Sequence, residues 1–365
     1  MINKTFKNFF KFILIILATI CFINPMLFLN SSKKAFALNT TSSEIVMEVN
    51  SKRVLYENNS NDKKYMASTT KILTAITVIE NFDISEEIKV TSNTTGIEGS
   101  SIYLEAGEVL TVEQLLYGLM LRSGNDCAET LAVNLVGSIE KFACLMNDMA
   151  KKIGANDSNF VNPHGLHDDN HYTTAYDLAL ISSYAIKNPI FEKIVSTKYI
   201  EIPWTTREYN RKLYNKNKML SKYEGANGIK TGFTKKAGRC LVTSCVKDGM
   251  ELVCVVLNCP QMWERSSSLL DKFYDEYNLL KVIESDNIID FYDTSLGDKV
   301  GVYVKNDIIL PISKNEKDYL KIKLNYSNIK GFIKKDSEIG KVEIYCKNNL
   351  LFEEKIYNIV DINEK

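Results

Sequence analysis

The stretch GRCLVTSCVKDGMELVCVVLNC, residues 238–259, contains two long runs of β-favouring residues on either side of Asp248-Gly249. An Asp-Gly turn between such runs is a strong signal for a β-hairpin. The earlier stretch EIVMEVNSKRVLY, residues 44–56, predicts a second hairpin around the turn at 50–52. The two hairpins are far apart in the chain, and we predict that they form one sheet built from both ends of this region.

The rest of this region is predicted to be mainly helical. The expected helices are Ser68–Phe82, 111–122, 128–154, 174–188 and 268–283. Thr111 and Gln114 have the spacing of a capping box at the start of the second helix. After residue 284 the chain becomes rich in Lys, Asn and Ile and alternates strictly at 320–326. We therefore predict an α+β fold, an antiparallel sheet against a helical block, followed by a small all-β domain.

The N-terminus has the pattern of an export signal. Basic residues precede an apolar stretch at 12–29, and Ala35 and Ala37 supply the small residues of a cleavage site. We predict a cleaved signal peptide over 1–37 and an exported protein, with membrane association through an uncleaved segment as the alternative. Cleavage leaves 40 basic and 45 acidic residues, a net charge of −5. This charge argues against nucleic acid as a partner.

The cysteines do not form a recognisable framework. Seven would remain after cleavage, an odd number, and no Cys-x-x-Cys occurs. Neither a zinc knuckle nor a redox pair is therefore indicated. Most of them lie in strand-like runs, where free cysteine acts as a small hydrophobic residue. We expect free thiols.

The pattern Ser-x-x-Lys is the first candidate for chemistry. It occurs five times, starting at Ser31, Ser60, Ser68, Ser244 and Ser327. Only Ser68 opens a long apolar helix, MASTTKILTAITVIE, where Lys71 follows one turn later on the same face. Backbone N–H groups at a helix start also favour developing negative charge. From this pattern alone, a polar first turn with its lysine in solvent is an equal alternative.

Two later patterns could complete a site. Ser123-Gly124-Asn125 lies between two predicted helices, where a loop can direct both polar side chains into a cleft. A literal Ser-Asp-Asn at 285–287 falls at the domain boundary, and we reject it. Lys230-Thr231-Gly232 occurs once and leads into the 238–259 hairpin, so we place it on a strand at a cleft edge. Gly232 would let an extended peptide pair with that strand.

These three patterns, in this order, resemble the motif set of the penicillin-interacting serine enzymes. The segments VLYENNSNDKKYMASTTKILTA, LLYGLMLRSGNDCAETLA, NPHGLHDDNHYTTAYDLALIS and GANGIKTGFTKKAGRCLV look like those of low-molecular-mass penicillin-binding proteins of the D-alanyl-D-alanine carboxypeptidase type. The resemblance covers about residues 40–283. It implies a β-lactamase/DD-peptidase-like catalytic domain over 38–284 and a C-terminal β-rich domain over 285–365.

The resemblance also implies a role for each residue of the site. Ser68 would attack the penultimate D-Ala of peptidoglycan stem peptides ending in D-Ala-D-Ala, with Lys71 as its base and Ser123 as a proton relay. Asn125 would hold the substrate amide, and Lys230, Thr231 and Arg265 would bind the terminal carboxylate. Gly232 would leave room for the peptide beside the strand, and the backbone N–H groups of Ser68 and Phe233 would form the oxyanion hole. No cofactor is implied, and β-lactam antibiotics would act as inhibitors.

Several alternatives stay open. A class A β-lactamase would need a Glu-x-x-Leu-Asn segment, and the sequence has none. Cleavage of cross-links by an endopeptidase is the main enzymatic alternative, and a muropeptide- or β-lactam-binding module the non-enzymatic one. His164, His167 and His171 form a cluster that suggests zinc. Pro163 and Gly165 interrupt any helical face, which argues against a zinc site. The resemblance implies that this segment is a structural loop without a metal.

Overall fold

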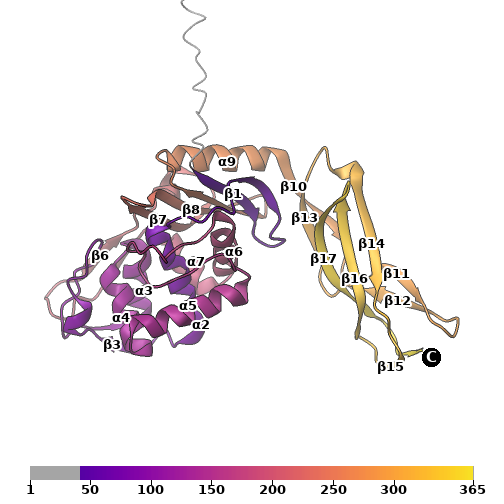
Figure 1. The fold of residues 1–365 in the computed structure, drawn as a ribbon, viewed down its shortest axis with the longest axis horizontal. Helices are drawn as coiled ribbons and strands as arrows, with labels where there is room; N and C mark the ends of the chain where they lie inside the picture. The colour runs from indigo at the N-terminus through magenta and orange to yellow at the C-terminus, as the bar shows by residue number, and fades with distance from the viewer. Residues whose placement is uncertain (1–41, 365) are drawn as a thin grey trace, which may run out of the picture. The chain divides into compact units, whose positions relative to one another are not determined.

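The structure, a computed structural model, describes residues 42–364, so the predicted signal lies outside the described residues. A five-stranded sheet has the strand order β2-β1-β9-β8-β7, with antiparallel pairing throughout. Its strands are β1 (Ser43–Glu48), β2 (Val54–Asn58), β7 (Ala226–Thr234), β8 (Gly238–Lys247) and β9 (Met250–Leu257). Both predicted hairpins are present, and the sheet joins them as expected (Figure 1).

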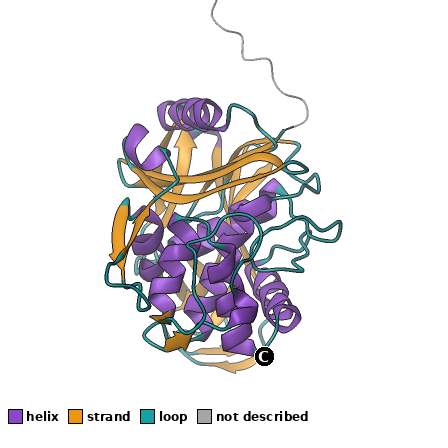
Figure 2. Cartoon of the chain, turned by 90° about the vertical axis from the view of Figure 1, so that its left-hand side faces the viewer, coloured by secondary structure: helices purple, strands orange, loops and turns teal. Residues whose placement is uncertain are grey.

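The sheet is buried on both faces. Val253 and Val255 of β9 pack into the core shared with the helical block, whereas Leu252 and Val256 pack against helix α9 (Met262–Glu276). In Figure 2, α9 lies along the top, above the strands, and most of the other helices lie below them. Burial on two faces explains why the central hairpin is a nearly continuous apolar run instead of an alternating one.

The helical block lies between the two hairpins in the sequence. Its helices are η1 (Ala67–Thr70), α2 (Lys71–Asn81), η2 (Ser92–Thr94), α3 (Val112–Leu121), α4 (Asn125–Val136), α5 (Ile139–Ile153), α6 (Ala175–Ile186), α7 (Pro189–Ser196) and α8 (Met219–Lys222). Two short antiparallel pairs accompany them: β3 (Glu87–Lys89) with β4 (Val109–Thr111), and β5 (Tyr199–Ile202) with β6 (Arg211–Tyr214).

Two of the predicted helices are wrong in extent. The single helix expected over 128–154 is two helices, because Gly137 takes φ +89° and ends α4, and Ser138 then caps α5 by accepting a hydrogen bond from the Lys141 N–H. A left-handed glycine followed by a serine cap is a strong stop and start signal. The Thr111 capping box, by contrast, is confirmed, since Thr111 and Gln114 exchange hydrogen bonds.

The helix expected over 268–283 is also wrong. Helix α9 ends at Glu276, and the following residues form strand β10 (Tyr277–Ile283), which pairs with β13 (Ile308–Ser313). Pairing with a distant strand overrides the local helical spacing here. The C-terminal part is all-β as predicted, with an apolar core of its own. Its other strands are β11 (Asp290–Asp293), β12 (Lys299–Tyr303), β14 (Leu320–Tyr326), β15 (Gly331–Ile333), β16 (Glu338–Cys346), β17 (Asn349–Asn358) and β18 (Ile362–Glu364), with one turn, η3 (Lys317–Tyr319).

The cysteines within residues 42–364 are all free thiols. Six of them are buried, and Cys144 is exposed. Burial raises the pKa of Cys240 and Cys254 to about 12, which keeps these thiols protonated and apolar. Of the helices in the described part of the chain, none has the length and apolar content needed to cross a bilayer.

Candidate active site

The site is built on the turn that opens α2. Ser68 lies in η1, and Lys71 is the first residue of α2. The Thr69 hydroxyl folds back onto the turn and donates to the Met66 carbonyl oxygen at 2.7 Å. Ser68 is partly exposed, whereas Lys71 is fully buried. Of the five Ser-x-x-Lys strings, the described ones other than Ser68 lie outside helix starts.

Three hydrogen-bond acceptors surround the Lys71 amine. Its Nζ lies 3.2 Å from Ser68 Oγ, 2.7 Å from Asn125 Oδ1 and 2.7 Å from the His164 carbonyl oxygen. These contacts use the full donor capacity of a protonated lysine. Burial, and then the positive charge of Lys230, lower the Lys71 pKa well below its usual value. The alternative of a lysine that reaches solvent is therefore excluded.

Ser123 and Gly124 lie between α3 and α4, as predicted, and Asn125 is the first residue of α4. Ser123 is 4% exposed and takes φ +65°, a left-handed conformation that is costly for a residue with a Cβ. Asn125 is fixed at three points. Its Nδ2 donates to the Glu98 carbonyl oxygen at 2.6 Å, its backbone N–H to the Ser100 carbonyl oxygen at 2.7 Å, and its Oδ1 accepts from Lys71. The turn thus joins the lysine to the loop before β4.

The Lys-Thr-Gly segment lies on β7, an edge strand of the sheet. Lys230 is 1% exposed, and burial, followed by the charge of Lys216, lowers its pKa to about 7. Gly232 packs so closely against the Ser68 turn that an added Cβ would lie 3.1 Å from Ser68 N. Phe233 is 64% exposed and extends the strand past this contact. A side chain at position 232 would push the strand away from Ser68.

Lys216 adds a third lysine to the cluster around Lys71 and Lys230, and no sequence pattern indicated it. Lys216 lies between β6 and α8, and its Nζ donates to Ser100 Oγ at 3.1 Å. The Ser100 carbonyl oxygen accepts the Asn125 N–H, so Lys216 and Asn125 both contact Ser100. The charge of Lys216 lowers the pKa of both Lys71 and Lys230. Lys216 belongs to no recognisable motif, and only the fold brings it here.

Arg265, predicted to bind the substrate carboxylate, is engaged elsewhere. Its Nη2 donates to Glu44 Oε2 at 2.6 Å, and its Nε lies 3.1 and 3.0 Å from the two carboxylate oxygens. The strand register places Glu44 opposite Val256, Val256 opposite Leu241, and Leu241 opposite Thr231. With strands about 4.8 Å apart, Glu44 and Thr231 are about 14 Å apart. The structure therefore does not bring Arg265 together with the other predicted residues.

The histidine segment forms a loop that supports the lysine. The His164 ring accepts a hydrogen bond from the Leu166 N–H at Nδ1, and its Nε2 lies 3.2 Å from a Glu129 carboxylate oxygen. His171 Nε2 lies 2.8 Å from Thr70 Oγ1 in the turn beside Ser68. Burial lowers the pKa of His164 to about 3 and that of His171 to about 4, so both rings are neutral. Among residues 42–364 no group of His, Cys, Asp and Glu has the geometry to hold a metal.

Gly165 is where this loop touches the nucleophile turn, and it gives a first prediction. It takes φ +87°, and a Cβ there would lie 1.9 Å from the Ala67 carbonyl oxygen. Gly165→Ala should lower the free energy of unfolding by about 3 kcal/mol, combining about 1–2 kcal/mol of backbone strain with about 1–3 kcal/mol of overpacking. Gly96→Ala is the matched control, since Gly96 takes φ +69° with nothing within 4 Å. If denaturant unfolding shows the same loss in free energy of unfolding for both variants, the close contact between Gly165 and Ala67 does not contribute to stability.

The buried Lys230 gives a second prediction, on stability and pH. Its folded pKa of about 7 lies below the ordinary 10.5, so between these pH values the unfolded chain binds more protons. The stability of the wild type relative to Lys230→Met should therefore rise from pH 7 to pH 10, by about 4 kcal/mol in total. Denaturant unfolding of both proteins across this range measures the difference. If the free energies of unfolding of the two proteins change with pH in parallel, Lys230 is not desolvated on folding.

Comparison with known proteins agrees with this geometry. A family model described as D-alanyl-D-alanine carboxypeptidase matches residues 31–261, and one described as the C-terminal domain of penicillin-binding protein 5 matches residues 277–364. The carboxypeptidase DacF of Bacillus subtilis is 33% identical over 243 residues, 64% of this chain and 62% of that relative. The alignment thus spans less than two thirds of that relative.

Longer matches include the C-terminal part. The carboxypeptidase DacA of Haemophilus influenzae is 29% identical over 322 residues, covering 83% of this chain and 80% of the relative. The crystal structure of penicillin binding protein 5 from the same species superposes with a TM-score of 0.77 at 26% identity, covering 88% of this chain and 97% of that one. The chain belongs to the D-alanyl-D-alanine carboxypeptidase family of serine peptidases, as one of its low-molecular-mass penicillin-binding proteins.

Proposed function

We propose that the protein removes the terminal D-Ala from peptidoglycan stem pentapeptides through an acyl-enzyme on Ser68. The observation that carries this proposal is the fully buried Lys71, whose Nζ lies 3.2 Å from Ser68 Oγ. A lysine with a lowered pKa is uncharged more often at neutral pH and can accept the serine proton. The same chemistry makes Ser68 the residue that β-lactams acylate.

The reaction has two steps. Ser68 Oγ bonds to the carbonyl carbon of the penultimate D-Ala while the amide C–N bond breaks, and Ser123 passes a proton to the departing amine. Water then hydrolyses the ester and frees Ser68. Backbone N–H groups of Ser68 and Phe233 stabilise the oxyanion, which the tight contact between Gly232 and the Ser68 turn supports.

The departing amino acid carries a carboxylate, and cations must hold it. Lys230 and Thr231 on the edge strand serve this role, with Asn125 holding the substrate amide. Lys216 serves this role in place of Arg265, because it contacts Ser100 beside Asn125, whereas Arg265 is paired with Glu44. Lys216 and Lys230 must be protonated to act in this way.

Export is also part of the proposal. The substrate lies outside the cytoplasmic membrane, and the N-terminal pattern supports delivery of the protein to the outer face or the cell wall. Cleavage of the signal would release the protein, and an uncleaved signal would keep it attached to the membrane. N-terminal sequencing of the exported protein distinguishes the two outcomes.

One experiment tests the activity. The mature protein is incubated with a synthetic pentapeptide ending in D-Ala-D-Ala and, separately, with a fluorescent penicillin. We expect release of D-Ala and a covalent adduct that persists for minutes. Rapid turnover of the penicillin would indicate a β-lactamase, and absence of both reactions would leave a binding module as the better assignment.

A further inference from the structure

Two of the three acceptors around the Lys71 amine come from other parts of the fold. Asn125 Oδ1 belongs to α4, and the His164 carbonyl oxygen belongs to the loop between α5 and α6. Both lie 2.7 Å from Lys71 Nζ, closer than Ser68 Oγ at 3.2 Å. The place of the proposed base beside Ser68 therefore depends on what holds these two acceptors.

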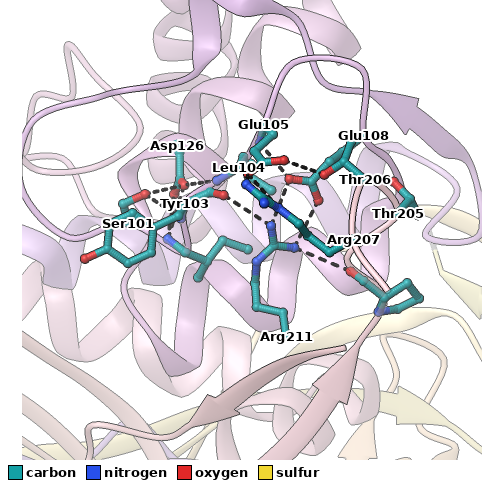
Figure 3. Close-up of polar contacts among 12 residues, drawn as sticks. Ser101, Tyr103, Leu104, Glu105, Glu108, Asp126, Thr205, Thr206, Arg207 and Arg211 are labelled. Carbon is teal, nitrogen blue, oxygen red and sulfur yellow. Dashed lines mark hydrogen bonds and ion pairs between the residues drawn. The ribbon is translucent and has the colours of Figure 1, made fainter. Parts of the chain in front are cut away.

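The first acceptor is fixed by the start of α4. The Asp126 carboxylate, next to Asn125 in the chain, accepts hydrogen bonds from Ser101 Oγ at 2.5 Å and from the Leu104 N–H at 3.1 Å, as Figure 3 shows. These bonds tie the first turn of the helix to the loop before β4. Asn125 is thus held independently of the loop that carries His164.

The second acceptor lies in a turn that is closed mainly by its own residues. Asn162 Nδ2 donates to the Leu166 carbonyl oxygen at 3.0 Å, and the Leu166 N–H donates to His164 Nδ1 at 3.1 Å. Helix α2 holds one side of the turn, because Thr74 Oγ1 donates to the Pro163 carbonyl oxygen at 2.7 Å. None of these bonds reaches α4.

A glutamate of α4 supplies the connection on the other side. Glu129 lies four residues after Asn125, one turn further along the same face of the helix. Its Oε1 lies 3.2 Å from His164 Nε2. Because the ring is neutral and its Nδ1 accepts from the Leu166 N–H, the ring proton is on Nε2 and faces this carboxylate. Helix α4 thus contacts Lys71 through Asn125, and contacts the residue that supplies the second acceptor through Glu129.

Glu129 is poorly suited to a purely stabilising role. Its side chain is only 19% exposed, and burial raises the pKa of its carboxyl group. Within residues 42–364 its carboxylate makes no hydrogen bond or ion pair besides the contact with His164. That ring is uncharged, so no opposite charge offsets the desolvation of the carboxylate. A carboxylate placed at this cost against His164, which itself holds the base, points to a function in the site.

We propose that Glu129 is a positioning residue for the base. By fixing the His164 side chain against α4, it keeps the His164 carbonyl oxygen on the Lys71 amine and the amine beside Ser68 Oγ. This role rests on the proposed function, because it acts through the same base and nucleophile. Among the hydrogen bonds and ion pairs of residues 42–364, Glu129 contacts neither Ser68 nor Lys71, so its effect on the reaction passes through His164.

The pH dependence of acylation separates positioning from a loss of folding. The His164 carbonyl oxygen accepts from the protonated Lys71 amine and so favours its charged form. Loss of this acceptor should lower the Lys71 pKa further and move the acidic limb of the rate profile to lower pH. A variant that is only less stable yields less folded protein and leaves the limb in place.

The other groups that act on Lys71 are unchanged when Glu129 is replaced. Burial and the charges of Lys230 and Lys216 lower its pKa, whereas Cys127 and Asp126 raise it. The pKa values of about 3 for His164 and about 4 for His171 leave both rings neutral at the pH of the assay. A shift of the acidic limb therefore reports on the acceptor that Glu129 holds.

The test uses the full-length mature protein and two replacements of Glu129. Stopped-flow measurement at several concentrations of a fluorescent penicillin, from about pH 5 to about pH 10, gives the limiting acylation rate constant and the dissociation constant of the complex that precedes it. We expect Glu129→Ala to lower the rate constant about tenfold, to leave the dissociation constant within about twofold, and to move the acidic limb down by about half a pH unit. Glu129→Gln, which retains an oxygen acceptor for the Nε2–H, should restore both the rate constant and the limb.

Two further variants complete the design. Glu113 of α3 is a partly exposed carboxylate that pairs with Lys193 at 3.0 Å, and Glu113→Ala should leave the acylation profile of the wild type unchanged. His164→Phe keeps a ring and the backbone carbonyl but removes the Nε2–H. In a protein that carries His164→Phe, Glu129→Ala should lower the rate constant no further. Thermal unfolding shows which variants are folded.

The possible failures can be told apart. Wild-type acylation in Glu129→Ala, or a slower rate with an unmoved acidic limb, overturns the positioning role, and the carboxypeptidase proposal stands if the wild type releases D-Ala. An equal fall in Glu129→Gln would show that the charge itself acts, which overturns the role as well. If Glu129→Ala does not fold, His164→Phe alone must show the tenfold fall and the shift, and a wild-type profile there overturns the role. If the wild type forms no penicillin adduct and releases no D-Ala, the proposed function itself fails.

Discussion

Ser68→Ala should abolish the penicillin adduct and lower the rate of D-Ala release by about 10⁴-fold or more, the usual scale for loss of a catalytic nucleophile. The physical reason is that no other hydroxyl can replace it. Ser123, the other serine of the cluster, is held in a turn with φ +65°, whereas Ser68 Oγ lies 3.2 Å from Lys71 Nζ. Fluorescence of the adduct after gel electrophoresis, together with D-Ala release, measures the effect.

The chain supplies a matched control for this substitution. Ser327 begins another Ser-x-x-Lys string, but it lies after strand β14 and is exposed. Ser327→Ala should keep both the adduct and the D-Ala release of the wild type. An adduct that survives Ser68→Ala, or one that is lost in Ser327→Ala, would contradict the assignment of the nucleophile.

Lys71→Arg is the second substitution with a large expected effect. An arginine keeps the charge and the hydrogen-bond donors, but its pKa above about 12 prevents it from accepting a proton. If Lys71 acts as the base, D-Ala release and acylation by penicillin should both fall by about 10³-fold. If its charge alone mattered, the arginine would retain most of the activity. Stopped-flow acylation measures the first step directly.

The folding of this variant must be verified independently. Lys71 is fully buried, and the larger guanidinium has to meet the acceptors on Asn125 and His164. Thermal unfolding and the near-UV spectrum report on the fold, and Lys71→Met, of similar length, tests the same loss without added volume. Acylation at the wild-type rate in a folded Lys71→Met protein would rule out the base.

The sequence predicted the parts of the site that depend on order and local structure. Ser68 was distinguished from the other strings by its helix start, and Lys230 was placed on a strand by the hairpin that follows it. Both features are local, and the fold confirms both positions. The extents of α4 and α9 were predicted wrongly because a strong local stop at Gly137 was overlooked and because β10 forms only by pairing with β13.

Arg265 and Lys216 show what sequence spacing leaves undetermined. The sequence around Arg265 does not indicate which partner its side chain meets, and Glu44 comes from the other end of the domain. Lys216 reaches the site only because β6 leads the chain past the loop that holds Ser100. Contacts between segments so far apart in the chain are set by tertiary packing and have no local signal.

The unpaired cysteines have a consequence for where this protein can mature. Because no covalent cross-link joins residues 42–364, the fold owes nothing to an oxidant or to a disulfide isomerase. Its two hairpins can come together equally well in a reducing compartment. Oxidation of cysteine should be confined to Cys144, since this is the exposed thiol among residues 42–364 and the other thiols are buried. The fold of residues 42–364 can therefore form without any oxidation step.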